Sequence, residues 1–366
     1  MIRKILKLTS ALMAAGFTYF LYSLSFKFPS VVEFVYSNGI YVFLTRTVGR
    51  LSAAVPVSLA EILLYIFVLS VSFYVIYIIV AFFKPKGEKL ENIGKRFLSF
   101  ASLLCVLYVI FVCFWGFNYA RKPLSQIMDL DTSDGYTTEE LKTLTDKLID
   151  ECNELRPQLR EDSNGVFTLS RTKEEVLESM GDIYERYAPD FINRSPKSKV
   201  KGVFTPNLLS HIETLGIYSP FTFECNVNMQ MPDLFFPATV AHEYSHLQGF
   251  AREDEANFIS FYVLSNSEEK DLRYSSYVHA LNYALISLRK SDVDAYRECW
   301  DRLHEGVKRD FRYESEYWEP FEDTKISEIS DEVYKEYLIS NGIPDEKKSY
   351  GRMLDLMLAL QRKGEL

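Results

Sequence analysis

Two histidines and a glutamate stand close together in the string His242-Glu243-Tyr244-Ser245-His246. On a helix, residues four apart share a face, so this spacing brings the two imidazoles together with the Glu243 carboxylate beside them. Two imidazoles and a third protein ligand can hold a zinc ion, and a neighbouring carboxylate can then take a proton from water at the ion. We therefore expect His242 and His246 to be metal ligands and Glu243 to be a general base.

The residues around this string are apolar, which favours a metal site over two ordinary surface histidines. The apolar flanking residues are Phe235, Phe236, Pro237, Ala238, Val240, Ala241, Leu247 and Phe250. The simpler alternative is a helix whose polar face happens to carry two solvated or hydrogen-bonded imidazoles. Burying two imidazoles and a carboxylate in such a segment is costly unless a strong partner such as a metal ion compensates them.

A third ligand should follow shortly, because a catalytic zinc site has three protein ligands and one open position. Gly249 stands three residues after the second histidine and can end the first helix. Glu253 and Glu255 follow as candidate ligands. Glu253 precedes Asn257 by four residues, so both share a helix face and Asn257 can hydrogen-bond a ligating histidine. We therefore prefer Glu253 as the third ligand.

The spacing of these residues resembles that of a known class of enzymes. The HExxH motif is the signature of zinc metallopeptidases, and HExxH followed by ExxAN is similar to the gluzincin pattern. Metzincins require a third histidine where this chain has Arg252. The string HEYSHLQGFAREDEANF, with apolar amino-terminal helices ending in Phe114-Trp115-Gly116-Phe117-Asn118-Tyr119, resembles an uncharacterised bacterial membrane family, domain of unknown function 3810. This resemblance implies a zincin-like hydrolase that binds Zn²⁺ and cuts peptide bonds, and it names no substrate.

Other parts of such a site are less well defined by the sequence. A tetrahedral intermediate needs an additional hydrogen-bond donor. Suitable side chains are Tyr218, Tyr274, Tyr277, Tyr337, Tyr350 and His279. Residues Phe221 to Met229 alternate apolar and polar side chains, which predicts a half-exposed strand just before the motif. As an edge strand it would either hold a peptide substrate by backbone pairing or simply cover the core.

The amino-terminal third predicts a membrane domain, residues 1–121. Apolar runs at about 6–26, 59–83 and 97–119 are long enough to cross a bilayer whose apolar core is about 30 Å thick. The alternative for the first run is a cleaved signal peptide, but two further spans favour a retained anchor. Residues 28–58 are mixed in character, and we expect an interfacial or short amphipathic helix there that does not cross.

The distribution of basic residues predicts the orientation of the spans. Arg3, Lys4 and Lys7 precede the first span, and the loop after the second carries Lys84, Lys86, Lys89, Lys95 and Arg96. The loop between the first two spans has only Lys27, Arg46 and Arg50. Because basic segments stay in the cytoplasm, residues 122–366 should lie outside it, in a multi-pass protein of the cell membrane.

Residues 122–366 are charged and long enough for one sizeable core. Helical periodicity recurs through this region, with short strands expected near Gly202 to Thr205 and Phe221 to Met229. We therefore expect a mainly α (α+β) chain: three amino-terminal transmembrane helices followed by a mostly helical zincin-like domain with a small antiparallel sheet. The net charge of −9 and the lack of a basic, aromatic-rich tract make nucleic acid an unsuitable partner. The five cysteines are widely spaced and predict neither a disulfide framework nor a metal site.

Three classes of function fit these features. The first is a membrane-anchored zinc metallopeptidase acting on peptide or protein substrates, which uses the full set His242, Glu243, His246 and Glu253. The second is a non-proteolytic zinc-binding sensor or peptide-binding protein on the same fold, in which Glu243 would be dispensable. The third is a structural membrane protein with a vestigial site, which predicts that a ligand or Glu243 has been lost. Intramembrane proteolysis is disfavoured because the motif lies over 100 residues beyond the last span.

Overall fold

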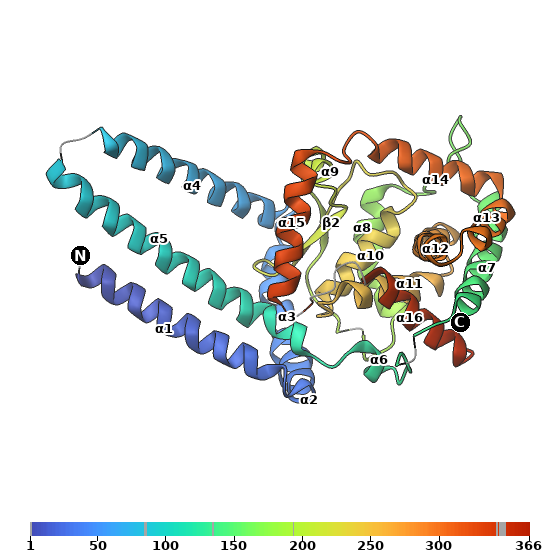
Figure 1. Ribbon diagram of the computed structural model, residues 1–366, viewed down its shortest axis with the longest axis horizontal. Coiled ribbons are helices and arrows are strands. Elements are labelled where there is room, and N and C mark those ends of the chain that lie inside the picture. Colours follow the sequence, from blue (N-terminus) through green and yellow to red (C-terminus); the bar gives the residue numbers. More distant parts are fainter. Residues whose placement is uncertain (1, 84–85, 134, 193, 342, 344–348) are drawn as a thin grey trace.

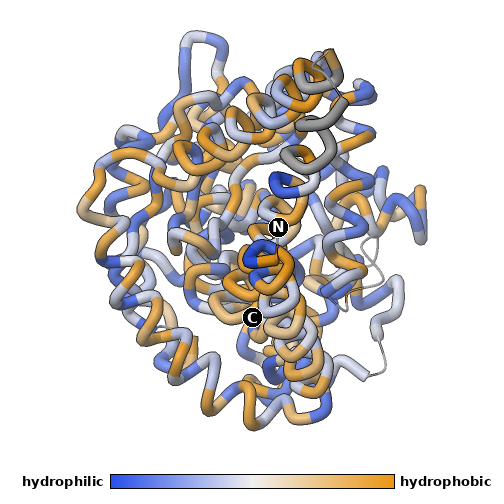
Figure 2. Tube along the Cα trace, turned by 90° about the vertical axis from the view of Figure 1, so that its left-hand side faces the viewer, coloured by the Kyte–Doolittle hydropathy of each residue, from blue (hydrophilic) through white to orange (hydrophobic). Residues whose placement is uncertain are grey.

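Three long helices project from one side of a larger helical body (Figure 1). In the computed structural model, which describes residues 2–83, 86–133, 135–192, 194–341, 343 and 349–366, they are α1 (Ile2–Ser25), α4 (Leu59–Phe82) and α5 (Lys86–Phe114). Each contains a stretch long and apolar enough to cross a membrane, and almost none of its side chains is buried. Figure 2 looks at the molecule from the side of these helices, whose apolar residues are orange. These features indicate a membrane protein.

The third apolar helix ends earlier than its sequence predicts. We expected a span to residue 119, but α5 ends at Phe114 and the short 3₁₀ helix η2 (Gly116–Ala120) follows. Asn118 is fully buried, and its Oδ1 accepts a hydrogen bond of 2.9 Å from Ser37 Oγ. The chain therefore leaves the span at a buried polar side chain whose oxygen is hydrogen-bonded to the preceding helical segment.

Residues 29–53 form one helical rod that packs against the body. It consists of α2 (Pro29–Val31), the π-helical segment η1 (Val32–Ile40) and α3 (Tyr41–Ala53). The rod is not one of the three helices in the described part of the chain that are long and apolar enough to span a membrane. Tyr41 is fully buried in the body, whereas Phe34 and Phe43 are exposed. One side of the rod therefore lies in the core of the body, while apolar side chains on its other side are exposed, and its predicted place in the membrane interface stays a prediction.

The helical body is built from capped amphipathic helices. Thr137 and Thr172 start α7 (Thr138–Leu155) and α8 (Lys173–Tyr187), each in a reciprocal capping box with a glutamate three residues later. The long α12 (Lys270–Ser291) packs against α7, α10, α11, α13 and α16, so it forms the centre of the core. The other helices are α6 (Leu124–Ile127), η3 (Arg156–Gln158), α9 (Pro206–His211), α10 (Phe236–Leu247), α11 (Glu253–Ser265), α13 (Val293–Arg302), α14 (Glu305–Trp318), α15 (Lys325–Ser340) and α16 (Ser349–Arg362).

A small sheet of three strands lies against α10. Its order is β1 (Val200–Gly202), β3 (Glu224–Val227), β2 (Gly216–Ser219). The fold is mainly helical with a small sheet, as predicted, but the sheet is mixed: β1 and β3 are parallel, and β2 and β3 are antiparallel. β3 is the predicted strand before the HExxH helix. It is central and not an edge strand, because β1 and β2 pair with its two sides.

Candidate metal centre

Helix α10 carries the two histidines and the glutamate of the HExxH motif. Pro237 stands in its first turn, where the missing N–H costs nothing. Gly249 ends the helical path with a φ of +89°, a backbone conformation that suits glycine. Except for His242, every residue of α10 is buried, so the site is set into the body and is not a surface feature.

The three predicted ligands meet at one point. Nε2 of His242 lies 3.1 Å from Nε2 of His246. Oε2 of Glu253, from the first turn of α11, lies 3.1 Å from His242 Nε2 and 3.5 Å from His246 Nε2. Glu255 points elsewhere, because its Oε1 accepts a hydrogen bond of 2.7 Å from the backbone N–H of Leu124. Of the two candidate glutamates, Glu253 is the one that the fold brings to the imidazoles.

Both imidazoles are oriented by hydrogen bonds from their other ring nitrogen. His242 Nδ1 lies 2.8 Å from Asn257 Oδ1, the contact expected from the spacing of Glu253 and Asn257. His246 Nδ1 lies 2.7 Å from the backbone oxygen of Phe250. Both partners are acceptors, so each Nδ1 carries a proton, and in the neutral form of each ring the lone pair is on Nε2. The lone pairs of the two Nε2 atoms therefore face each other and the Glu253 carboxylate.

This arrangement of donor atoms fits a zinc ion. Four ligands at about 2.0–2.1 Å from a tetrahedral zinc are about 3.3 Å from one another, close to the three separations measured here. Three electron-rich atoms at such distances repel one another unless a cation or a proton lies between them. Outer hydrogen bonds from each imidazole to Asn257 and to a carbonyl are the arrangement that ligating histidines usually have. His242, His246 and Glu253 would hold the ion.

The electrostatics of the three side chains point to the same requirement for positive charge. Burial alone would lower the pKa of His246, but the adjacent Glu253 carboxylate outweighs burial and raises this pKa to about 9. Burial would raise the pKa of Glu253, yet the two imidazoles hold it well below its usual value. The cluster therefore attracts a positive charge to the point where the donor atoms meet.

Glu243 lies beside this cluster with little freedom to move. Burial raises the pKa of its carboxyl group, while the two imidazoles act in the opposite direction. Gly216 of β2 packs directly on it, since a Cβ at Gly216 would stand 2.7 Å from Glu243 Oε1. Within the described residues, Glu243 Oε2 is buried without a hydrogen-bond partner. A buried carboxylate oxygen without a protein partner is what a base needs to accept a proton from water or substrate.

The carboxyl end of α10 is held by residues from the amino-terminal third of the chain. The Tyr41 hydroxyl lies 3.2 Å from the backbone oxygens of both His246 and Leu247. Arg121 donates a hydrogen bond of 2.8 Å to the backbone oxygen of Gly249, and its charge suits the negative end of the helix dipole. Carbonyl groups that a helix end leaves unpaired are thus satisfied. Sequence spacing gave no sign of these contacts, which join residues more than 120 positions apart.

The side chains suggested as donors to the tetrahedral intermediate have different partners in the structure. The hydroxyls of Tyr218, Tyr274 and Tyr337 bond to Tyr41, Asp310 and Tyr119, respectively. Tyr277 packs on Phe261, and His279 packs on Phe235 and Tyr283. Burial, and the nearby His242, lower the pKa of His279 to about 3. The side chain of Tyr350 lies outside the described residues.

One hydroxyl close to the ligands belongs to a residue that the sequence did not single out. Burial, and the nearby carboxylates of Glu253 and Glu243, raise the pKa of Tyr334 on α15, so its hydroxyl lies close to the candidate site. Tyr337, one turn later, contacts Tyr119, whose hydroxyl is also close enough to Glu253 to feel its charge. Helix α15 therefore covers the candidate site. Its sequence has many charged residues and a narrow apolar stripe, so we had not predicted a helix there.

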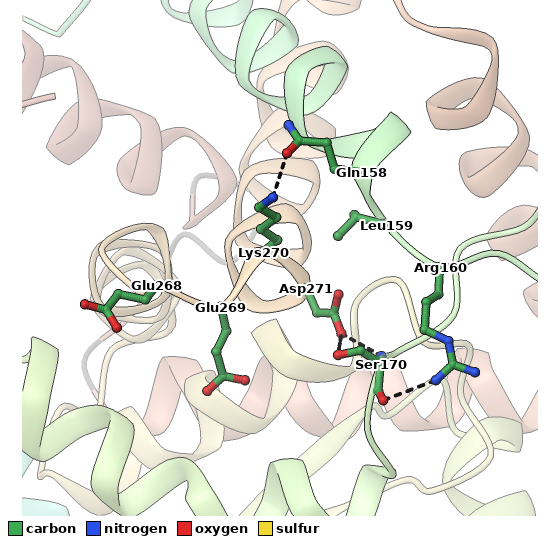
Figure 3. Close-up of a pocket in the computed structure, with 8 residues that line it drawn as sticks. All are labelled: Gln158, Leu159, Arg160, Ser170, Glu268, Glu269, Lys270 and Asp271. Atoms are coloured by element: carbon green, nitrogen blue, oxygen red, sulfur yellow. Dashed lines mark hydrogen bonds between the residues drawn. The ribbon is translucent and has the colours of Figure 1, made fainter.

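A cavity of about 350 Å³ lies elsewhere on the body (Figure 3). In its lining, Lys270 donates a hydrogen bond to the side-chain oxygen of Gln158. The Asp271 carboxylate accepts hydrogen bonds from the backbone and side chain of Ser170. Arg160 donates a hydrogen bond to the backbone oxygen of Ser170, and Glu269 forms an ion pair with Arg171, which lies outside the lining. None of the lining residues belongs to the cluster around His242, so the cavity is separate from the candidate metal centre.

Comparison with known proteins places the chain in a family. No curated protein and no solved structure matches it significantly. The model of one family, described as "Protein of unknown function (DUF3810)", matches residues 36–358. The matched region begins in the rod that holds α10, includes the whole candidate metal centre and ends within α16. The chain therefore belongs to the DUF3810 family of proteins of unknown function.

Proposed function

We propose that this protein is a membrane-anchored, zinc-dependent metallopeptidase of the gluzincin type. The observation that carries the proposal is the convergence of His242 Nε2, His246 Nε2 and Glu253 Oε2 at mutual distances of 3.1–3.5 Å. Asn257 and a backbone carbonyl fix the two rings in the tautomer that leaves Nε2 free. A helix that merely displayed two histidines would need neither the third donor nor these outer hydrogen bonds.

The residues around the centre supply the remaining parts of peptide hydrolysis. A bound zinc ion would supply acidity to a water molecule and polarise the scissile carbonyl. Glu243 would accept a proton from that water and return it to the leaving amine, for which its unpartnered Oε2 is suited. The Tyr334 hydroxyl, beside Glu253, is placed to donate a hydrogen bond to the carbonyl oxygen as it gains negative charge.

The edge of the small sheet offers a place for a peptide. Among the described residues, no strand pairs with the outer side of β2. Gly216, the first residue of β2, touches the Glu243 carboxylate, so a peptide added to this edge would pass beside the general base. In this proposal the peptide would pair with β2, because β3, the strand for which the sequence left substrate binding open, has a neighbour on each side.

We further infer that the protein crosses the membrane three times with its helical body outside the cytoplasm. The amino-terminal end of α1 and the adjoining ends of α4 and α5 all lie away from the body (Figure 1). Lys4 donates to the Lys95 backbone oxygen, and Arg96 stacks on Tyr77, so basic groups gather at that end. Lys84 lies outside the described residues. A basic far end supports a cytoplasmic location for it.

The proposal is tested with the full-length chain purified in detergent. We would measure zinc by mass spectrometry and cleavage of a quenched peptide library for the native protein, His246→Ala, Glu243→Gln and Glu255→Gln. The native protein, Glu243→Gln and Glu255→Gln should each hold about one zinc per chain, as expected for a site with three protein ligands. His246→Ala should lose it.

Cleavage should be abolished in Glu243→Gln and His246→Ala and retained in Glu255→Gln, which is the matched control in the same helical turn as Glu253. Zinc binding without cleavage by the native protein would favour the sensor or peptide-binding alternative. If the native protein holds no metal under conditions that load zinc, the proposal is wrong.

A further inference from the structure

Helix α15 has more apolar surface than the body covers. Ile326, Ile329 and Val333 follow a spacing of three and then four residues, so they form one stripe along the helix. Their exposed fractions are 53%, 63% and 65%. Leu338, on the adjoining side, is buried against the body. The apolar face of α15 is therefore only partly used by the fold, and a continuous apolar stripe of this kind indicates a further contact.

The carboxyl-terminal half of α15 touches two of the membrane-spanning segments. The Tyr337 ring lies 6.1 Å from the ring of Phe111, within the apolar segment Ile93–Phe114. Asn341, the residue after the helix, accepts a hydrogen bond of 3.0 Å from Tyr22, within the segment Ile2–Ser25. This end of α15 is thus at the level of the last turns of these spans, where the apolar part of a bilayer gives way to its polar surface.

The other half of α15 is connected to the second span, α4, through α9 and the residues on either side of it. Ser330 Oγ lies 3.4 Å from the backbone oxygen of Ile212, just after α9. Before α9, the backbone N–H of Thr205 donates a hydrogen bond of 3.0 Å to Glu61, in the first turn of α4. Phe204 and Leu208 in this segment are about half exposed, as is Ile217 on the neighbouring strand. The apolar surface therefore extends from α15 towards the start of α4.

Most of the charged side chains of α15 lie away from the stripe of Ile326, Ile329 and Val333. Glu328, Asp331 and Lys335 are exposed on the far side of the helix, whereas Glu332 and Glu336 are exposed at the edge of the stripe. In Figure 1, α15 runs along the face of the body from which the three long helices project, the face that Figure 2 views from the front. A charged face and an apolar face on one helix, placed beside the ends of membrane spans, suit the boundary between lipid and water.

We propose that α15, with Phe204, Leu208 and Ile217, is a lipid-contact surface that lies in the membrane interface. The bilayer then covers the stripe of α15 and supports the helix that stands over Glu253. Because Tyr334 and Tyr337 belong to this helix, the membrane position of α15 sets how the candidate site is covered. If the proposed peptidase function holds, substrates reach the site along the membrane surface, so they are polypeptides anchored in or spanning the bilayer. The lipid contact itself does not depend on that function.

Spin labels on the full-length protein in phosphatidylcholine–phosphatidylglycerol liposomes test the proposal directly. Cys105 and Cys113 are replaced by Ala, and the other three cysteines are buried. A nitroxide is attached at Val333→Cys, at Ile329→Cys and, as the matched control on the charged face, at Lys335→Cys. Collision rates with oxygen, which concentrates in lipid, and with a water-soluble nickel chelate are then compared.

We expect the oxygen-to-nickel ratio to be several-fold higher at positions 329 and 333 than at 335. Equal ratios at the three positions would overturn the proposal, because the stripe would then face water. Low rates with both reagents, together with spin–spin broadening, would overturn it in favour of a second copy of the chain on the stripe. Two labelled positions protect the test against one variant that fails to fold. None of these readouts requires zinc or peptidase activity.

Discussion

The two sides of the candidate site are built very differently. On the α10–α11 side, the ligands stand on neighbouring helices in the core, and Asn257, Tyr41 and backbone groups fix each piece. On the α15 side, Tyr334 and Tyr337 reach the site from a helix that is exposed along much of its length. The two sides therefore have different roles. The buried side holds the ligands in one geometry, and α15 on the exposed side forms a cover over the site.

Local stability should follow the same division. Segments with many buried apolar contacts open only with the whole domain, whereas segments with few such contacts open at lower cost. Phe258 and Ile259 of α11 are fully buried, whereas on α15 Ile329 and Val333 are mostly exposed. The ligand side is therefore expected to stay closed while α15 moves, and the membrane is the surface that would steady α15.

The largest expected effect comes from removing the residues that hold α10 from behind. A fragment of residues 122–366 matches the exterior domain expected from the sequence, but it lacks Tyr41 and Arg121. Their loss would uncover Phe223 and Phe250 and would leave the carbonyls at the end of α10 unpaired. We expect this fragment to show no cooperative thermal unfolding.

The matched fragment is 29–366, which keeps the rod and removes only α1. We expect it to unfold cooperatively in detergent, because its lost contacts with the body are peripheral ones such as that of Tyr22 with Asn341. A well-folded 122–366 fragment would show that the amino-terminal rod is not needed to hold the ligand side.

The next effect concerns the cover and distinguishes it from the ligand side. Tyr334→Phe removes a hydroxyl beside Glu253 without removing a ligand or a core side chain. We expect kcat to fall about 100-fold, the usual effect of losing one donor to a developing oxyanion, with KM and zinc content nearly unchanged. Steady-state kinetics on the best library peptide measure this. Tyr313→Phe, at an exposed position on α14, is the control; loss of zinc in Tyr334→Phe would instead assign this tyrosine to the ligand side.

A smaller effect is expected at the back of α10. Tyr41→Phe keeps the ring in the core but removes the hydroxyl that serves the backbone oxygens of His246 and Leu247. The free energy of unfolding should fall by about 2 kcal/mol, because buried carbonyls lose their partner. Thermal scans in detergent, with zinc removed by a chelator, measure this fall. An unchanged melting temperature would mean that water or a shifted side chain replaces the hydroxyl.

The sequence predicted those parts of the site that depend on short spacings. His242 and His246 are four residues apart, as are Glu253 and Asn257. Each pair therefore shares a helix face whenever its segment is helical, whatever the rest of the fold. Gly249 marks the break between the two helices, because it takes a positive φ. The apolar runs likewise required three long helices, although the third ends at Phe114 where the chain turns into the body.

Contacts between distant segments were not visible in the same way. Nothing in the spacing of Tyr41 relates it to His246. The strand expected at an edge of the sheet is central, because β1 pairs with its other side. Helix α15 was missed because its apolar residues point in two directions, with Ile329 and Val333 exposed and Leu338 buried, which blurs the periodicity of a helix with a single buried face. The cover is therefore the part of the site that tertiary structure alone defines.

The smallest expected effect is at α14, the helix that leads into α15. Burial raises the pKa of Glu314 to about 7, and Trp318 donates a hydrogen bond of 2.7 Å to its Oε1. Between the ordinary pKa near 4.5 and this value, the folded protein keeps a proton that the unfolded chain has released, so stability falls as pH rises through this window. Below the window both states are protonated and the difference vanishes.

Glu314→Gln cannot release a proton, so its stability relative to the native protein should rise between about pH 4.5 and pH 7 and then stay constant, by on the order of 1 kcal/mol. Melting temperatures of both proteins across this range measure the difference, in which the titration of all other groups cancels. Glu316→Gln, at an exposed position of the same helix, should show no such trend. If the melting temperatures of Glu314→Gln and the native protein change with pH in parallel, water reaches this carboxyl group. The carboxyl-terminal part of α14 would then be as mobile as α15.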